Sequence, residues 1–323
     1  MLVEPLLKVE HLKKIYPIRK NVFQRSLGLQ ALNDISFEVY PGETLSIVGE
    51  SGCGKSTLAK LILHIEPVTS GKMLFQQKDI TFLSAVERKA YWKQVQMVFQ
   101  NPYSSLNPRW KVGRIIGEPL QLNTKFSPSE IREKVLSLMN QVGLSSEHFD
   151  RYPHQFSGGQ RQRIGIARAL CLRPKLLVCD EPVSALDVSI QSQVLNLLMD
   201  LQQQGEIPLT TLFISHDLSV VEHISDRILV MYLGKIVESG KREQIFSRPK
   251  HPYTEALLSA IPKLNLAEKK PRIVLTGEIP SPLNPPSGCS FRTRCPYVRS
   301  ECSKISMELL TPEPEHQTAC PFF

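Results

Sequence analysis

Residues 7–48 alternate between apolar and polar positions in the way that half-buried β-strands do. The segments LKVEHLKKIY and ALNDISFEVY carry this pattern most clearly. TLSIVGE, which begins at Thr44, is almost continuously apolar, as in a fully buried strand, and it ends in a glycine-rich loop. TLAKLILHI, from Thr57, places its apolar residues at helical spacing. We therefore predict a strand, a glycine loop and a helix in succession.

Helices and strands alternate along the middle of the chain. Apolar residues at Ile131, Val135, Leu138 and Val142 form a helical stripe, which Gly143 ends. Such alternation predicts an α/β fold around a sheet with a large parallel part. The further expected elements are a helix in RQRIGIARALCL, a buried strand in LLVCDEP, a long helix in IQSQVLNLLMDLQQQ, a strand in TTLFIS and a hairpin-like pair in ILVMYLGKIVESG.

The composition changes after about residue 245. HPYTEALLSAIP predicts a short helix, and PSPLNPPSGCSFRTRCP is dense in proline, serine and glycine. Four of the seven cysteines lie between Cys289 and Cys320. We therefore expect two domains, residues 1–245 and a small cysteine-rich C-terminal module of residues 246–323.

Overall composition is that of a globular protein, with 41% hydrophobic and 22% charged residues among 323. No stretch approaches the roughly 18 apolar residues that cross a bilayer, and the N-terminus lacks a signal-peptide pattern. We therefore expect the chain to stay in the cytosol, where thiols remain reduced. The net charge of +8 suits a negatively charged partner or is simply spread over the surface. No run of five lysines or arginines occurs, so we expect no nucleic-acid partner.

The segment GESGCGKST matches the phosphate-binding pattern G-x-x-x-x-G-K-[ST] and lies between a predicted strand and a predicted helix. Its glycines allow backbone N–H groups to surround the phosphates, and the helix N-terminus adds partial positive charge. Lys55 is expected to reach the β- and γ-phosphate oxygens, and Ser56 to bind Mg²⁺. The pattern indicates an ATPase or another NTPase, with nucleotide-binding positions at Gly49, Ser51, Gly52, Gly54, Lys55, Ser56 and Thr57.

A second possible anion site lies in FSGGQRQRIGIARAL, just before a predicted helix. A serine hydroxyl and glycine N–H groups at a helix N-terminus can bind phosphate. About twenty residues later, the apolar strand LLVCDE ends in Asp180 and Glu181. This order resembles the ATP-binding cassette (ABC) family, whose signature is LSGGQ with leucine in place of Phe156. The signature positions here are Ser157, Gly158, Gly159 and Gln160.

The resemblance implies a fold and a set of roles. The fold is an ABC nucleotide-binding domain with a parallel-sheet core, an antiparallel β subdomain and a helical subdomain. Asp180 holds Mg²⁺, mostly through water, and Glu181 polarises the attacking water. The signature Ser157–Gln160 binds the γ-phosphate of ATP held by the opposite subunit, so the active unit is a head-to-tail dimer around two ATP molecules.

Four further positions match family elements. SALD, Ser184–Asp187, resembles the D-loop, which touches the opposite subunit. His216 resembles the switch histidine that contacts the γ-phosphate, and Gln100 resembles the glutamine that senses Mg²⁺ and faces the membrane subunit. Tyr16 lies where the family stacks an aromatic ring on adenine, although it could instead be a core residue at a strand edge.

Three segments narrow the resemblance to the ATP-binding subunits of dipeptide and oligopeptide permeases. They are FQNPYSSLNPR from Phe99, HPYT from His251 and PSPLNPPSGCSFRTRC from Pro280. The family implies import of peptides, with a second ABC ATPase, two integral membrane permease subunits and an extracytoplasmic peptide-binding protein as partners. The chain would lie peripherally on the cytoplasmic face of the inner membrane. The alternatives are an importer of nickel, glutathione or haem precursors, and a soluble ABC-type ATPase serving a metabolic enzyme complex.

The late cysteines follow the spacing C-x5-C-x6-C-x17-C. Four thiolates in a cytosolic module favour a metal, although the spacing is looser than the paired knuckles of structural zinc. The family resemblance implies a [4Fe–4S] cluster with four cysteine ligands, and Zn²⁺ or unliganded thiols remain alternatives. The expected ligands are Cys289, Cys295, Cys302 and Cys320, whereas Cys53, Cys171 and Cys179 are expected to be packing residues.

Overall fold

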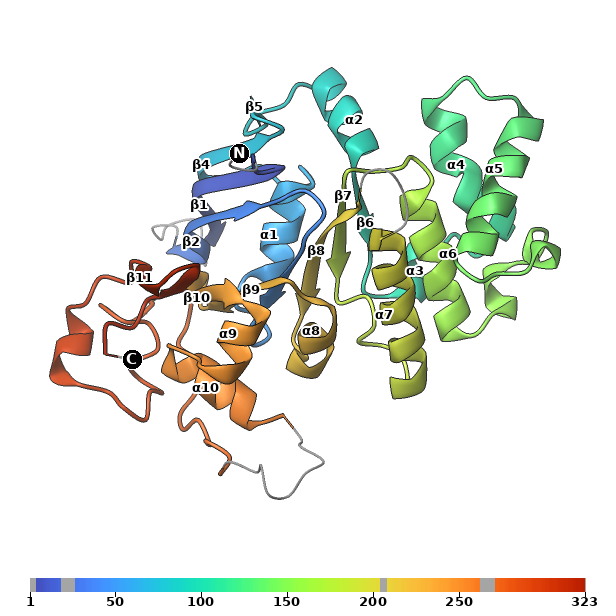
Figure 1. Cartoon of the computed structure of the whole chain (residues 1–323). Helices are drawn as coiled ribbons and strands as arrows, with labels where there is room; N and C mark the ends of the chain where they lie inside the picture. Colours follow the sequence, from blue (N-terminus) through green and yellow to red (C-terminus); the bar gives the residue numbers. More distant parts are fainter. Residues whose placement is uncertain (1–3, 19–26, 204–207, 262–270, 323) are drawn as a thin grey trace. The chain divides into compact units, whose positions relative to one another are not determined.

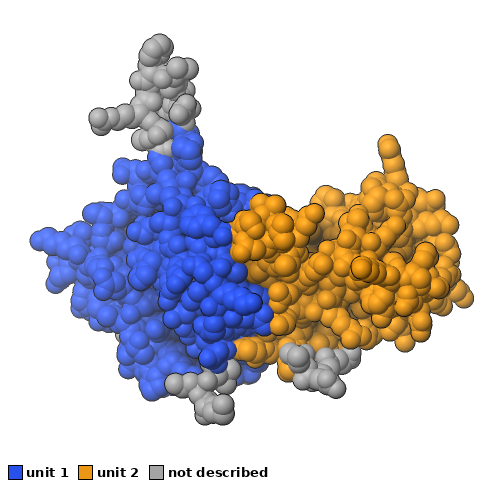
Figure 2. Space-filling view, turned by 90° about the horizontal axis from the view of Figure 1, so that it is seen from above, with its two compact units in different colours: residues 1–40, 44–82, 215–323 blue, residues 41–43, 83–214 orange. Residues whose placement is uncertain are grey.

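The computed structural model describes residues 4–18, 27–203, 208–261 and 271–322 of the chain. They divide into two compact units (Figure 2). The first unit comprises residues 1–40, 44–82 and 215–323, and the second comprises residues 41–43 and 83–214.

A four-stranded antiparallel sheet forms one part of the first unit. The alternation of apolar and polar residues in the sequence explains it, because one face of the sheet is buried and the other is partly exposed. Leu7, Val9 and Leu12 are buried on one face, while the positions between them are partly exposed. The strands run in the order β2 (Leu27–Val39), β1 (Leu7–Ile18), β4 (Ser70–Phe75) and β5 (Lys78–Asp79).

The strand that precedes the glycine loop, β3 (Thr44–Val48), is buried along its whole length. It pairs in parallel with β9 (Arg227–Tyr232), which turns back through Leu233 and Gly234 into the antiparallel β10 (Lys235–Lys241). Both turn residues have positive φ, as tight hairpins require. The predicted hairpin is therefore confirmed.

C-terminal residues extend this sheet (Figure 1). Strand β12 (His316–Thr318) pairs with β10, and β11 (Leu310–Glu313) pairs with β12. The end of the chain thus belongs to the same compact unit as the glycine loop, while the expected domain boundary near residue 245 remains a prediction. The helices of this unit are α1 (Lys55–Ile62), α8 (Leu218–Ile224), α9 (Arg242–Ser247) and α10 (Pro252–Ser259).

The second unit contains three parallel strands, β6 (Val95–Val98), β7 (Leu176–Asp180) and β8 (Thr210–Ser215). Every residue of β7 and β8 is buried, which explains why their central residues form continuous apolar runs rather than alternating with polar ones. The predicted parallel strands are confirmed. The helices of this unit are α2 (Ala85–Gln94), α3 (Pro102–Ser105), α4 (Val112–Asn123), α5 (Pro128–Gln141), α6 (Gly158–Leu170) and α7 (Val188–Gln203).

Helices α4, α5 and α6 pack against one another. Ser127 and Glu130 form a capping box at the start of α5, and Gly143, with a φ of 71°, follows its end. Val135 and Val142 of the predicted stripe are buried. In the part of the chain that the structure describes, no helix combines the length and hydropathy needed to span a membrane.

Candidate functional site

The phosphate-binding pattern forms the connection between β3 and α1 in the first unit. Lys55 is the first residue of α1 and is buried. Its Nζ donates hydrogen bonds to the carbonyl oxygens of Gly49 (2.7 Å) and Glu50 (3.1 Å). The lysine therefore lies along the loop, with its charge held beside the N-terminus of a helix that has no acidic residue in its first turn.

Two glycines of the loop are required by packing as well as by backbone conformation. Gly54 has a φ of 109°, and a Cβ there would lie 2.5 Å from the carbonyl oxygen of Ala31. A Cβ on Gly49 would lie 2.2 Å from the carbonyl oxygen of Met231. The loop thus fits tightly between β2 and β9, a constraint that the phosphate-binding pattern by itself did not reveal.

The remaining predicted positions of the loop lie toward solvent. Ser51, Gly52 and Ser56 are exposed, and Thr57 is half-buried in the first turn of α1. A Cβ at Gly52 would meet no atom within 4 Å, although its φ of 80° favours glycine. The hydroxyl of Ser56 is therefore placed where a hard cation could reach it.

Tyr16 lies on β1 and is half-buried. Its hydroxyl donates a hydrogen bond to Glu66, and the Nζ of Lys14 lies 4.8 Å from the ring centroid. Burial is the main cause that raises the pKa of Tyr16, while a hydrogen bond with Thr57 opposes it. Tyr16 is thereby placed beside the phosphate loop, and its role in stacking on adenine remains a prediction.

His216 directly follows β8 and is exposed. The next residue, Asp217, is the N-cap of α8, and its carboxylate accepts a hydrogen bond from the backbone N–H of Ser219 at 2.8 Å. The local chain direction at His216 is therefore fixed by a strand end and a helix cap.

In the second unit, two of the predicted catalytic residues are in direct contact. The Nε2 of Gln100 donates a hydrogen bond to Oε2 of Glu181 at 2.7 Å, although the two residues are 81 positions apart. Asp180 is the buried last residue of β7. Glu181 has a left-handed φ of 47°, and its N–H donates to the carbonyl of Ile214. Strain of this kind persists only where the surroundings fix the residue, so the backbone of Glu181 is fixed while Gln100 orients its carboxylate.

The signature residues form the N-terminus of α6. Ser157 is the exposed N-cap, and its hydroxyl accepts a hydrogen bond from the N–H of Gln160 at 3.3 Å, while the Gln160 side chain accepts from the N–H of Ser157. Phe156 is buried. A Cβ on Gly159 would lie 2.3 Å from Ile190 of α7, so this glycine allows the two helices to approach closely.

The predicted D-loop packs beside this helix start within the second unit. Both the N–H and the hydroxyl of Ser184 donate to the carbonyl of Glu181. A Cβ at Gly158 would lie 3.3 Å from the side chain of Leu186. The segment Ser184–Asp187 therefore contacts Glu181 at its start and the signature residues through Leu186.

The four late cysteines line a single cavity in the first unit. Burial raises the pKa of the Cys289 thiol and that of Cys295, the latter to about 11. Within the described residues, no three His, Cys, Asp or Glu side chains are grouped so that they could hold a metal ion. The lining includes Cys289, Cys295, Cys302, Cys320, His251, Phe291, Arg292 and Arg299.

Two contacts of the phosphate loop were not anticipated from the sequence. Arg294 and Tyr253, far along the chain, both bind Glu50. The sequence singled out the segments FRTRC and HPYT, which contain them, but only as features of a family. Nothing in their local pattern indicates a contact with residues more than 200 positions earlier.

Comparison with known proteins places these features in a family. Residues 32–184 match the family described as ABC transporter, and residues 237–302 match the oligopeptide/dipeptide transporter C-terminal region. The chain is 54% identical to the dipeptide transport ATP-binding protein DppF of Escherichia coli (strain K12), over 95% of this chain and 92% of that protein. It is 51% identical to the oligopeptide transport ATP-binding protein AppF of Bacillus subtilis (strain 168), over 98% and 97%.

Similar solved structures also belong to the ABC family. The chain resembles the ATP-binding cassette MJ0796 in a dimeric post-hydrolysis state bound to ADP and Pi, with a TM-score of 0.65 and 27% identity over 73% of this chain and 98% of that one. It also resembles CbiO1 from Clostridium perfringens, part of the ABC transporter complex CbiONQ, with a TM-score of 0.66 and 30% identity over 76% and 92%. The chain therefore belongs to the ABC transporter family, among the ATP-binding subunits of dipeptide and oligopeptide transporters. The predicted cassette fold is confirmed.

Proposed function

We propose that this chain hydrolyses ATP and so drives import of dipeptides or oligopeptides through a membrane permease. One observation carries the proposal. The chain aligns over nearly its whole length with relatives that are peptide transport ATP-binding proteins. Peptide is preferred over nickel, glutathione or haem precursors because the names of these relatives specify dipeptide and oligopeptide transport.

The proposed roles are those that the family resemblance implies, and the local geometry of each residue supports them. Lys55 and the N–H groups at the start of α1 would bind the β- and γ-phosphates. Mg²⁺ would neutralise charge on the phosphates, and the oxygen donors of Ser56 and Asp180 suit such a hard cation. Glu181, held by Gln100, would accept a proton from the attacking water, and His216 would contact the γ-phosphate.

The signature supports a composite site. Ser157 is exposed at the N-terminus of α6, where its hydroxyl and the N–H groups behind it can face an anion outside this chain. We expect a second ABC ATPase to supply the ATP bound there. Two integral membrane permease subunits and an extracytoplasmic peptide-binding protein complete the assembly, which places this chain peripherally on the cytoplasmic face of the inner membrane.

We further propose that the cysteine-lined cavity holds a [4Fe–4S] cluster, although in this structure no three side chains of the described residues are grouped closely enough to hold a metal ion, so the four thiols would have to approach one another on binding. Four thiols surround one space, and Arg292 and Arg299 beside them would offset the negative charge of four thiolates. A bound metal centre would lower the raised pKa values of Cys289 and Cys295. The cluster would stabilise a proline-rich segment that has little apolar area of its own.

The transport function is tested by isolating the intact complex from native membranes and reconstituting it in vesicles. Two polytopic proteins and a second ATPase should co-purify, and a peptide-loaded binding protein should stimulate ATP hydrolysis and peptide uptake. Isolation of the chain with metabolic enzymes alone would contradict the transporter. Stimulation by a nickel or glutathione binding protein in place of the peptide protein would contradict the substrate.

The cluster is tested on protein purified without oxygen. About four irons and four sulfides per chain are expected, with loss of both in Cys295→Ser. Cys171→Ser is the matched control, because Cys171 is buried at the C-terminal end of α6 and is not one of the residues that line the cavity. Wild-type protein with zinc alone, or with neither iron nor sulfide, would contradict the proposal.

A further inference from the structure

The second residue of the phosphate loop, Glu50, has each of its polar groups held by a partner. Its N–H donates to the hydroxyl of Tyr253 at 2.9 Å, and its carbonyl accepts from Lys55 at 3.1 Å. Its carboxylate binds both terminal nitrogens of Arg294, at 2.6 and 3.0 Å. A paired contact of this kind fixes both distance and orientation. Glu50 is therefore clamped from the C-terminal part of the chain.

The Arg294 side of the clamp is well protected. The Arg294 side chain is 7% exposed, against 26% for Glu50, so water competes poorly for this ion pair. Hydrogen bonds to Glu50 are the main cause that raises the pKa of Arg294. The guanidinium therefore stays protonated beside the Glu50 carboxylate. Tyr232 lies against the guanidinium, and Phe291 packs on Tyr232 with ring centroids 5.3 Å apart. Arg294 directly precedes Cys295, so it is anchored at the edge of the cysteine-lined cavity.

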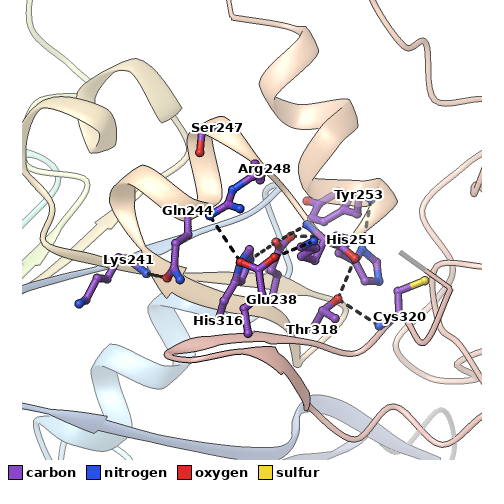
Figure 3. Close-up of polar contacts among 12 residues, drawn as sticks. Glu238, Lys241, Gln244, Ser247, Arg248, His251, Tyr253, His316, Thr318 and Cys320 are labelled. Carbon is purple, nitrogen blue, oxygen red and sulfur yellow. Dashed lines mark hydrogen bonds and ion pairs between the residues drawn. The ribbon is translucent and has the colours of Figure 1, made fainter.

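The Tyr253 side of the clamp is held by a buried polar network (Figure 3). Tyr253 is fully buried, and its N–H donates to Nδ1 of His251 at 3.1 Å. The backbone N–H of His251 donates to Glu238, which is itself fully buried and also accepts from Nε2 of His316 at 2.8 Å. The Tyr253 hydroxyl is thus placed by contacts among α10, β10 and β12.

A second link of the same network reaches the cysteine-lined cavity. The hydroxyl of Thr318 donates to the carbonyl of Lys250 at 3.0 Å and accepts from the N–H of Cys320 at 3.2 Å (Figure 3). The segment that positions Tyr253 and the segment that carries Cys320 are therefore joined. Both supports of Glu50 originate in the C-terminal part of the chain, and neither is part of the phosphate-binding pattern.

We propose that Arg294 and Tyr253 are positioning residues for ATP binding, acting through Glu50. The inference rests on the proposed role of Gly49–Thr57 as the phosphate site. A carboxylate in this loop repels the negatively charged triphosphate unless a cation pairs with it. Arg294 neutralises that charge, and Tyr253 fixes the backbone from which the loop's N–H groups point at the phosphates. The loss of either contact should weaken ATP binding more than it slows the hydrolysis of bound ATP.

The test is a double-mutant cycle in the assembled transporter, read out as KM and kcat for ATP and as the Kd of a non-hydrolysable ATP analogue. Arg294→Met should raise KM and Kd about tenfold and leave kcat within about twofold. Arg294→Lys should fall between wild type and Arg294→Met, because it keeps the charge but not the paired geometry. Arg294→Met combined with Glu50→Gln should recover most of the affinity, since no unpaired carboxylate remains.

Two further variants make the test specific. Tyr253→Phe keeps the buried ring and removes only the acceptor for the Glu50 N–H, and it should raise Kd about threefold. Arg248→Met is the matched control, because Arg248 pairs with Glu313 of the C-terminal strand β11 and is not among the contacts of the phosphate loop. This control should leave KM and Kd within about twofold.

Several outcomes would overturn the inference. Unchanged Kd in Arg294→Met, a fall in kcat at constant KM, or no recovery in the double variant would each do so. If Arg294→Met failed to fold, Arg294→Lys and Tyr253→Phe would still decide the question. Failure of the proposed function looks different: the wild-type complex itself would not bind or hydrolyse ATP.

Discussion

The phosphate loop and the C-terminal tail, residues 271–322, are parts of one compact unit but differ in how their contacts arise. The loop is a contiguous segment whose conformation follows from glycines, a strand end and a helix start. The tail obtains its structure from partners far away in the sequence, such as Glu50 and β10. Local chemistry can be predicted from a pattern, whereas long-range pairing needs the fold. The predictions below test each side of this comparison.

Glu181→Gln should have the largest effect, because its carboxylate, which accepts a hydrogen bond from the distant Gln100, is the proposed general base. We expect ATP hydrolysis by the complex to fall by about 10²–10⁴-fold, the usual contribution of a general base, while ATP binding is retained. A steady-state ATPase assay with a nucleotide-binding measurement checks both. Glu222→Gln on α8 is the control, and near-normal activity of Glu181→Gln would remove Glu181 from the proposed role.

Gly54→Ala tests how much of the loop's need for glycine is local backbone conformation and how much is packing against β2. Its φ of 109° is strained for alanine, and the new Cβ would lie 2.5 Å from a backbone oxygen. We expect the free energy of unfolding to fall by about 3 kcal/mol and ATP affinity to be lost. Denaturant unfolding and nucleotide binding provide the two readouts.

Gly52→Ala is the matched control for that variant, because its Cβ would meet no atom within 4 Å. The strain of the positive φ remains, so the free energy of unfolding should fall by only about 1–2 kcal/mol. Equal losses in the two variants would mean that packing against Ala31 is not what requires glycine at position 54.

His251 gives the buried polar network that positions Tyr253 a dependence on pH. Burial lowers the pKa of His251 to about 3, well below the 6.5 of an exposed histidine. Below pH 6.5 the unfolded chain binds a proton that the folded chain does not, so stability is lost as the pH falls from 6.5 toward 3. Between pH 7 and pH 5 we expect this one group to contribute a loss of about 2 kcal/mol.

The control for this effect is His251→Asn, which keeps an acceptor at the N-cap of α10 and has no titrating ring. Chemical denaturation of both proteins at pH 7 and pH 5 checks the expectation. The difference in unfolding free energy between them should shrink as the pH falls. Parallel pH profiles would show that His251 gains its proton as readily in the folded protein as in the unfolded one.

The smallest expected effect is that of Ser157→Ala, which distinguishes the contribution of Ser157 to helix capping from its contribution to ATP hydrolysis. Ser157 and Ser127 both form capping boxes, on α6 and α5 respectively, so alanine at either position should reduce stability by about 1 kcal/mol. Only Ser157→Ala should also reduce ATP hydrolysis, because only Ser157 belongs to the signature. Thermal unfolding together with ATPase assays distinguishes the two contributions. Equal activity of the two variants would restrict Ser157 to a structural role.

Much of the fold was predictable because periodicity is a local property. The buried strands β7 and β8, the stripe of α5 and the β9–β10 hairpin follow from apolar spacing and from Gly143 and Gly234. The pairing of β12 with β10 was not predictable, because HQT is too short to carry a period. The predicted site residues were found in order along the chain, but the contact between Gln100 and Glu181 required the structure.

By itself the sequence determined the segments whose chemistry is contiguous: the phosphate loop, the signature at a helix start, the carboxylates after a buried strand and the four cysteines of the tail. Only the tertiary structure decided that those cysteines share one cavity and that Arg294 and Tyr253 hold Glu50. The physical reason is the range of the forces involved. Backbone conformation and helix capping depend on neighbours in sequence, whereas ion pairs and buried hydrogen bonds form between whichever residues the folded core brings within about 3 Å.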